Sequence, residues 1–464
     1  MTTDSVGYRS AAQLRAAFAA GAMAPADVVA ELLDRAGGMD AATSGVTELD
    51  PRGAHAAAVD SGRRYRSGGA RALEGIPVLV KDLIDVAGMP ATYGSQMFRA
   101  HRPARDAEVV QRIRAAGGIV LGKTATHEFA WGVTTDGTAA GPIRNPWDPS
   151  RVPGGSSGGS AVALALGLAP LALGTDTAGS IRIPAALCGV AGLRPSAGTV
   201  PHAGVFPLAP SLDQVGPMAR TVEDVALLHG VIAPPALTRS GSAPLTFGIL
   251  RSHLPVEPAP AVAVALEEMA AALSGAGHHV TELSGTGLAD AYDILGDVVL
   301  TEGLAVHRSA GLWPHRADDY LPGVRSRLQR ADTTDGVAAA DERRLRRARI
   351  AKVAGRILRH VDVVVSPASA VAAAPIGHDR DPCAPAAVAF RAGVIACCAW
   401  QSLTGLPTCV VRVRFDSGGL PIGLQFTARR GADGVALAAA SLAMRLTADI
   451  QDQWPSPGVG QQLP

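Results

Sequence analysis

Two serines in glycine-rich segments are the residues of this chain best suited to chemistry. Ser156 lies in segment 153–160 (Pro-Gly-Gly-Ser-Ser-Gly-Gly-Ser), and Ser180 ends segment 174–180 (Gly-Thr-Asp-Thr-Ala-Gly-Ser). Glycine allows positive φ and close approach of the backbone to a ligand. A serine among glycines can therefore expose its hydroxyl while several backbone N–H groups point to one place. This combination of nucleophile and converging donors predicts acyl transfer.

Three other interpretations of segment 153–160 fit the sequence less well. A flexible linker would not be followed by a dense apolar run such as 161–173. A phosphate-binding loop needs Gly-Lys-Ser/Thr, and no lysine lies between 124 and 351. Residues 155–159 match the G-x-S-x-G pattern of α/β-hydrolases, which requires a strand leading into the serine. Three prolines in 145–153 argue against that strand.

A lysine is the third candidate for the chemistry. Only three of the 42 basic residues are lysines: Lys81, Lys123 and Lys352. Lys81 ends the apolar run 76–80, which predicts a buried strand, whereas we expect Lys123 to be structural. A lysine has an ordinary pKa of about 10.4, and it accepts a serine proton only when neutral. Burial lowers a lysine pKa, so Lys81 is a candidate base.

Alternating helical and strand patterns must position these residues. The patterns predict helices at 9–36 (with a start near 24–27), 106–116, 158–168, 260–274, 287–310, 336–360, 385–403 and 432–446. They predict strands at 75–86, 119–122, 171–173, 245–250, 280–283, 361–365, 408–414 and 420–427. Alternation of this kind is typical of an α/β fold with a mixed or parallel sheet.

Strands at both ends of the chain favour one continuous sheet. We therefore expect residues 1–464 to form a single domain, with strands in 361–427 completing the sheet. The Pro- and Ser-rich segment 233–244 is the strongest internal interruption.

Composition excludes several classes of protein. The 464 residues are 47% hydrophobic and 18% charged, with net charge +1, so nothing indicates a nucleic-acid or anionic-membrane surface. The five cysteines show no disulfide or metal-site spacing, and no histidine pair has metal spacing. No signal peptide is visible, and run 161–173 is too short to span a bilayer. We expect a cytoplasmic protein without metal or other cofactor.

Several motifs in order resemble the amidase signature family. Segments 75–82, 121–124, 145–148, 153–160, 174–185 and 211–217 fit that family's pattern, and 419–425 fits near the C-terminus. The resemblance is strongest over about 70–230. It implies the amidase signature fold, in which helices sandwich a large mixed β-sheet.

The resemblance assigns a role to each candidate residue. It implies Ser180 as the nucleophile that forms an acyl-enzyme, Ser156 as a bridging serine held by a cis peptide, and Lys81 as the base. Asp176 and Arg182 would then support the loop through hydrogen bonds, and Ser157 would bond locally.

Developing negative charge would be stabilised by an oxyanion hole. We expect it to use the backbone N–H groups of Thr177, Ala178, Gly179 and Ser180. Ala178 departs from the family's more usual glycine, and its methyl group would narrow the acyl pocket.

The substrate-binding residues are less clear from the sequence. We expect Gly132 and Val133 at the substrate, together with at least one of a polar set: His307, His315, Asp318, Asp319, Tyr320 and Arg325.

The expected function is hydrolysis of a small carboxamide to a carboxylate and ammonia or an amine. Two alternatives stay open. One is the A subunit of a glutamyl-tRNA(Gln) amidotransferase, which releases ammonia from glutamine and passes it to partner subunits. The other is a non-catalytic binding scaffold, which would have no reason to keep the lysine and both serines. The expected partner is a small-molecule amide, with neither nucleic acid nor membrane, and the family resemblance suggests a homodimer.

Overall fold

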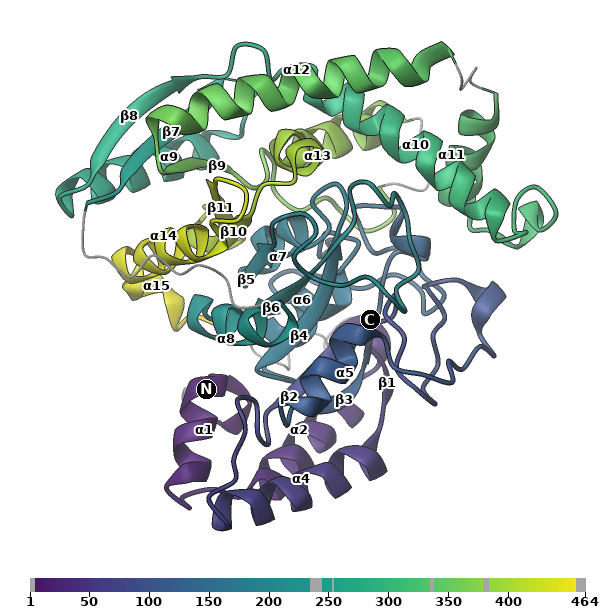
Figure 1. Cartoon of the computed structure of the whole chain (residues 1–464), viewed down its shortest axis with the longest axis vertical. Helices are drawn as coiled ribbons and strands as arrows, with labels where there is room; N and C mark the ends of the chain where they lie inside the picture. Colours follow the sequence, from purple (N-terminus) through teal and green to yellow (C-terminus); the bar gives the residue numbers. More distant parts are fainter. Residues whose placement is uncertain (1–4, 234–243, 253, 334–337, 379–383, 456–464) are drawn as a thin grey trace.

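One mixed sheet of eleven strands runs through the described part of the chain (Figure 1). The computed structural model describes all residues except 1–4, 234–243, 253, 334–337, 379–383 and 456–464. The strands are β1 (Val46–Leu49), β2 (Pro77–Lys81), β3 (Ile119–Thr124), β4 (Leu171–Asp176), β5 (Ala191–Arg194), β6 (Gln214–Ala219), β7 (Thr246–Ser252), β8 (His279–Ser284), β9 (Val363–Pro367), β10 (Thr408–Phe415) and β11 (Pro421–Ala428).

The strand order places C-terminal strands in the middle of the sheet. The order is β1-β3-β2-β4-β6-β5-β10-β11-β9-β7-β8. Strand β2 pairs in parallel with β3 and β4, whereas β4 and β6 are antiparallel. Strand β10 pairs with β5, so residues near 410 hydrogen-bond directly to residues near 192. The prediction of a mixed α/β fold is confirmed.

Fifteen α-helices of the described residues accompany the sheet. They are α1 (Ala11–Ala19), α2 (Pro25–Gly37), α3 (Ala41–Ser44), α4 (Pro51–Arg66), α5 (Glu108–Ala115), α6 (Gly158–Ala165), α7 (Arg182–Cys188), α8 (Val222–Ile232), α9 (Pro260–Gly275), α10 (Ala291–Ser309), α11 (Pro322–Asp332), α12 (Ala338–His360), α13 (Pro385–Thr404), α14 (Asp433–Leu446) and α15 (Ala448–Gln451). Five of them have a proline in their first turn, where its fixed φ suits a helix and its missing N–H needs no partner.

The helices lie on both faces of the sheet. Helices α6 and α7 pack against each other, and α8 and α14 form a second packed pair. In Figure 1 the two pairs lie on opposite sides of β5, β6 and β10. Helices α10, α11, α12 and α13 form a further layer, in which α10 contacts the other three.

The predicted elements match the structure closely. Each expected strand is present, and the helical pattern over 9–36 is divided into α1 and α2 at the predicted start near Pro25. The sequence patterns did not predict strands β1, β5 and β6 or helices α3, α4, α8, α11 and α15. The interruption expected at 233–244 falls mostly outside the described residues.

Helix α13 is long and apolar enough to cross a membrane by length and composition alone. However, 72% of its most apolar 18-residue window is buried inside the protein. It contacts α7, α10 and α12, so its apolar surface is accounted for by packing within the fold.

Candidate active site

Strand β2 carries Lys81 into a fully buried position between β3 and β4. The lysine Nζ lies 2.7 Å from Ser156 Oγ, 2.9 Å from Ser157 Oγ and 2.8 Å from Thr175 Oγ1. Residues from β2, from the glycine-rich segment and from β4 therefore meet at one nitrogen. The structure brings together Lys81 and Ser156 as predicted.

The three hydroxyl neighbours of Nζ fit either protonation state of Lys81: an ammonium donates to all three, and a neutral amine donates to two and accepts from one. The Ser157 hydroxyl also lies 3.2 Å from the Thr175 carbonyl oxygen, which can only accept, so Ser157 donates there and accepts from Lys81. In the neutral state, the hydroxyl that donates to Nζ would be that of Ser156 or of Thr175, since Ser157 already donates elsewhere.

The surroundings of Lys81 oppose a positive charge. Burial lowers the pKa of Lys81 well below its ordinary value, and the charges of Asp176 and Asp213 offset this only in part. Desolvation penalises the ammonium form and leaves the neutral form unaffected. Lys81 therefore has the environment of a base, as the sequence predicts.

Tight packing of the glycine-rich segment holds Ser156 in place. The Gly155–Ser156 peptide bond is cis, as the family resemblance implied. The Ser156 carbonyl accepts a hydrogen bond from the His127 N–H (3.3 Å). A Cβ at Gly155 would lie 2.9 Å from the Thr134 amide nitrogen, so a side chain at position 155 would clash with the backbone.

Ser180 lies where the segment after β4 turns into α7. It is 4% exposed, and its carbonyl accepts a hydrogen bond from the Ser157 N–H (3.1 Å). This hydrogen bond joins the glycine-rich segment to the loop after β4, next to the two predicted catalytic serines. Among the described residues, no hydrogen bond joins the Ser180 hydroxyl to Ser156. Catalytic hydrogen bonds often tighten only when substrate binds.

A buried ion cluster supports the loop before Ser180. Asp176 pairs with Arg182 (2.9 Å) and Arg194 (2.9 Å), and all three side chains are fully buried. Burial alone would raise the pKa of Asp176, but the two guanidinium groups outweigh it and hold the pKa well below its usual range. The supporting role expected for Asp176 and Arg182 agrees with this geometry.

The Asp176 carboxylate takes up one of the N–H groups expected in the oxyanion hole. The Gly179 N–H donates to Asp176 Oδ1 (3.0 Å), so this predicted donor already has a partner within the protein. Among the described residues, the N–H groups of Thr177, Ala178 and Ser180 have no hydrogen-bond partner in the structure and stay candidates. Position 179 also requires glycine, because its φ is 114° and a Cβ there would lie 2.8 Å from Cys398 Sγ.

A cavity of about 450 Å³ opens beside Ser180. On one side it is lined by Ala178 and by the consecutive residues Ala130, Trp131, Gly132 and Val133. The structure therefore places the predicted residues Gly132 and Val133 next to the candidate nucleophile. The methyl group of Ala178 forms part of the wall, as expected from its departure from glycine.

Helices α10, α11 and α13 line the other side of the cavity, and here one expectation was wrong. None of the polar set at 307–325 is among the lining residues. His307 is buried and lies 2.8 Å from the Tyr320 hydroxyl, while Arg325 pairs with Asp318. On α11 it is Ser326, Arg327 and Arg330 that line the cavity, because the helical period turns them to that face.

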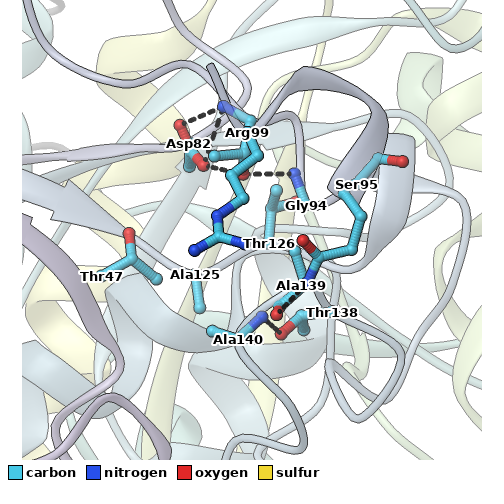
Figure 2. A pocket seen from close by; sticks show the side chains of 12 residues that line it. Thr47, Asp82, Gly94, Ser95, Arg99, Ala125, Thr126, Thr138, Ala139 and Ala140 are labelled. Atoms are coloured by element: carbon cyan, nitrogen blue, oxygen red, sulfur yellow. Dashed lines mark hydrogen bonds between the residues drawn. The ribbon is translucent and has the colours of Figure 1, made fainter. Parts of the chain in front are cut away.

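Lys123 has a structural environment, in line with its expected role. Its ammonium lies 3.1 Å from Asp82 and donates to the Ile84 carbonyl at 2.7 Å. Asp82 also borders a second cavity of about 380 Å³, into which Figure 2 shows Arg99 reaching. Lys81, Ser156 and Ser180 are not among the residues that line this second cavity.

Sequence reasoning missed Thr175 and underestimated Ser157, since both contact Lys81. Thr175 lies on β4 directly before Asp176, a position without any local pattern that marks it. Asp213, which accepts from the Thr177 hydroxyl at 2.6 Å, was also missed. Burial raises the pKa of Asp213 to about 6.

Comparisons with known proteins show the family of the chain. The Amidase family model matches residues 27–437. A Thermus thermophilus protein, named as the A subunit of glutamyl-tRNA(Gln) amidotransferase, is 36% identical, over 92% of this chain and 95% of its own.

Solved structures match over nearly the whole chain. A structure described as an amidase has a TM-score of 0.83 and 31% identity, covering 94% of this chain and 99% of its own. The A subunit of the Thermotoga maritima glutamyl-tRNA(Gln) amidotransferase has a TM-score of 0.76 and 27% identity, covering 98% and 97%.

Proposed function

The chain belongs to the amidase signature family, enzymes that act on amide C–N bonds, and we propose that Ser180, Ser156 and Lys81 carry out its reaction. The observation that carries this proposal is the 2.7 Å contact between Lys81 Nζ and Ser156 Oγ in a fully buried setting. A serine hydroxyl is a weak nucleophile until a neighbour takes its proton. Lys81 and Ser156 supply such a neighbour through one relay step.

In the first half of the reaction, Ser180 Oγ attacks the carbonyl carbon of the amide. Its proton passes to Ser156, and the proton of Ser156 passes to Lys81. Negative charge develops on the carbonyl oxygen, where the N–H groups of Thr177, Ala178 and Ser180 stabilise it by about 3–4 kcal/mol each. The proton returns through Ser156 to the departing nitrogen, the C–N bond breaks, and ammonia or an amine leaves. Ser180 then carries the acyl group as an ester.

In the second half, water attacks this ester while the same relay takes its proton. The carboxylate product leaves and Ser180 regains its hydrogen. The buried position of Lys81 supports both halves, since the amine must be neutral each time it accepts a proton.

Two roles for this reaction each have a supporting observation. The Thermus relative, similar over 92% of this chain, favours the amidotransferase role, in which the chain would hydrolyse glutamine and deliver ammonia to partner subunits. The higher TM-score of the solved amidase, 0.83 against 0.76, supports a stand-alone amidase. The curated relatives make the amidotransferase role the first candidate.

Ammonia release separates the two roles. The purified chain would be assayed with L-glutamine and a panel of small primary amides, alone and with the other amidotransferase subunits of the same genome. Glutamine hydrolysis that requires those subunits supports the first role, and hydrolysis of small amides by the chain alone supports the second. Absence of ammonia under every condition would overturn the proposed function.

The nucleophile is tested by covalent labelling. We expect an aryl sulfonyl fluoride to add one label to the wild-type protein and none to Ser180→Ala, as measured by mass spectrometry of the intact chain. The variant should also lose about 10⁴–10⁶-fold in kcat. Equal labelling of both proteins would show that another residue is the nucleophile.

A further inference from the structure

The wall of the cavity beside Ser180 has a buried part and a more exposed part. The buried part of its wall is apolar, with Val133, Leu208 and Leu295 at 5%, 4% and 1% exposure. The other lining residues of α10, α11 and α13 are half-buried or exposed. The buried part suits the scissile carbonyl and an aliphatic chain, and the more exposed part suits a polar group.

Arginines from two helices line the half-buried and exposed part of the cavity. Arg327 and Arg330 stand three residues apart on α11 and so share a face, and Arg391 comes from α13. Burial raises the pKa of Tyr292 on α10, and the charges of Arg391 and Arg330 both act to lower it. Two guanidinium groups from separate helices therefore lie within electrostatic reach of one phenol that lines the cavity.

Positive charge exceeds negative charge in this part of the cavity. Three arginines and two aspartates, Asp293 and Asp297, line the cavity, which leaves one excess positive charge (3 − 2 = 1). Asp297 also lies 3.6 Å from Arg346, so part of its charge is already compensated from outside the cavity. Arg327, Arg330 and Arg391 take part in further interactions within the protein, and a ligand would join this network.

We propose that the substrate is an amide whose acyl chain ends in a carboxylate, bound by the arginines of α11 and α13. A guanidinium group presents paired N–H donors that match the two oxygens of a carboxylate. The scissile carbonyl would lie at Ser180, the aliphatic segment against the apolar walls, and the carboxylate among Arg327, Arg330 and Arg391. This inference rests on the proposed function. With a primary amide, hydrolysis consumes one water and releases a dicarboxylate and ammonia.

The test compares amides that differ only in the terminal group, which is a carboxylate in one member of each pair and uncharged in the other. Succinamate, glutaramate and adipamate are paired with butanamide, pentanamide and hexanamide, and L-glutamine with its methyl ester. Ammonia release gives kcat/KM for each substrate. We expect at least one carboxylate substrate to exceed its uncharged partner by tenfold or more, with the difference mostly in KM. High salt should reduce the ratio, because it screens charges near the surface.

Arginine variants locate the effect. In Arg330→Gln and Arg391→Gln, the ratio of carboxylate to uncharged kcat/KM should fall at least fivefold toward 1. Arg316→Gln is the matched control: it removes one charge from an exposed pair with Asp319 outside the cavity, and the ratio should stay at its wild-type value.

Each outcome decides the inference. Wild-type ratios near 1 for every pair would overturn it while leaving amide hydrolysis intact. Absence of ammonia from all eight substrates, with and without the other amidotransferase subunits, would overturn the proposed function, and the inference with it. The wild-type comparison needs no variant, so poor folding of an arginine variant would not prevent the decision.

Discussion

The two walls of the candidate active site are built in different ways. The wall at the end of the sheet, formed by β2, the glycine-rich segment and the β4–α7 loop, is buried and held by dense hydrogen bonds. The wall of α10, α11 and α13 is half-exposed and carries charged side chains. In the proposed reaction, the first wall holds the reacting groups and the second faces the variable part of the substrate. Under that proposal, the densely hydrogen-bonded wall carries the chemistry and the more exposed wall carries the specificity.

The largest expected effect is in the sheet wall, at Lys81. Lys81→Ala removes the proposed base and should lower kcat by about 10³–10⁵-fold. Because burial lowers its pKa and the neutral amine is the active form, the wild-type rate should rise with pH as this group loses its proton. Rate–pH profiles of the wild type and of Lys81→Ala test this, and the rise of the rate with pH should be missing in the variant.

A lysine that is not among the residues lining the cavity provides the control for that experiment. Lys352 on α12 is exposed, so Lys352→Ala should keep the wild-type profile. If the rate of Lys81→Ala still rose with pH in the same range, a different base would be operating.

The second effect concerns the stability of the same wall. Asp176→Asn leaves two buried guanidinium groups without their counter-charge and should lower the free energy of unfolding by about 3–5 kcal/mol. Asp60→Asn removes the partner of Arg63 in an exposed pair and should cost about 1 kcal/mol or less. Urea unfolding measures both. Similar losses for the two variants would contradict the supporting role of the buried cluster.

The third prediction concerns Glu128, which links the two walls. Its carboxylate is buried and accepts from the Ser95 hydroxyl (2.7 Å) and from the Leu321 N–H at the start of α11 (2.9 Å). Residues Ala130 to Val133 follow it into the cavity wall. Burial raises the pKa of Glu128 to about 7 from 4.5, against a smaller opposing effect of its hydrogen bonds and Arg325.

The sign of the pH effect follows from that shift. Between about pH 4.5 and 7 the folded protein binds more protons at Glu128 than the unfolded chain, so this group makes stability fall as pH rises. Glu128→Gln removes the titration. The variant should resemble the wild type at pH 5 and be more stable by up to about 3 kcal/mol at pH 8. Urea unfolding at both pH values tests this, and an equal difference at the two would refute it.

The smallest effect is expected in the helical wall. Ser326→Ala removes a hydroxyl from a half-buried position on the cavity surface. It should change KM by about fivefold or less and leave kcat and the unfolding free energy near wild type, because surface substitutions usually cost less than about 0.5 kcal/mol. Steady-state kinetics test this. A tenfold fall in kcat would show that the two walls do not divide the work as proposed.

Most of the sheet could be predicted because its strands are short apolar runs with distinct boundaries. Strand β6 is the informative exception: it contains Gly216 and Pro217, which local propensity places outside a strand. It forms because the neighbouring strand β4 pairs along its whole length, from Leu171 with Ala219 to Asp176 with Gln214. Long-range pairing of this kind has no local pattern in one sequence.

In the candidate site, too, local sequence features were predictable and long-range contacts were not. Sequence by itself determined Lys81, Ser156 and Ser180 as candidates, because a rare lysine after an apolar run and serines among glycines are local features. It also predicted Gly132, Val133 and Ala178 near the substrate, and all three line the cavity beside Ser180. Only the tertiary structure decided that Ser157 and Thr175 contact Lys81. It also decided that Asp176 accepts the hydrogen bond of the Gly179 N–H. The same holds for Arg330 and Arg391, which line the cavity. These contacts join residues distant in sequence, and the physical reason is that burial and charge pairing are set by packing between elements.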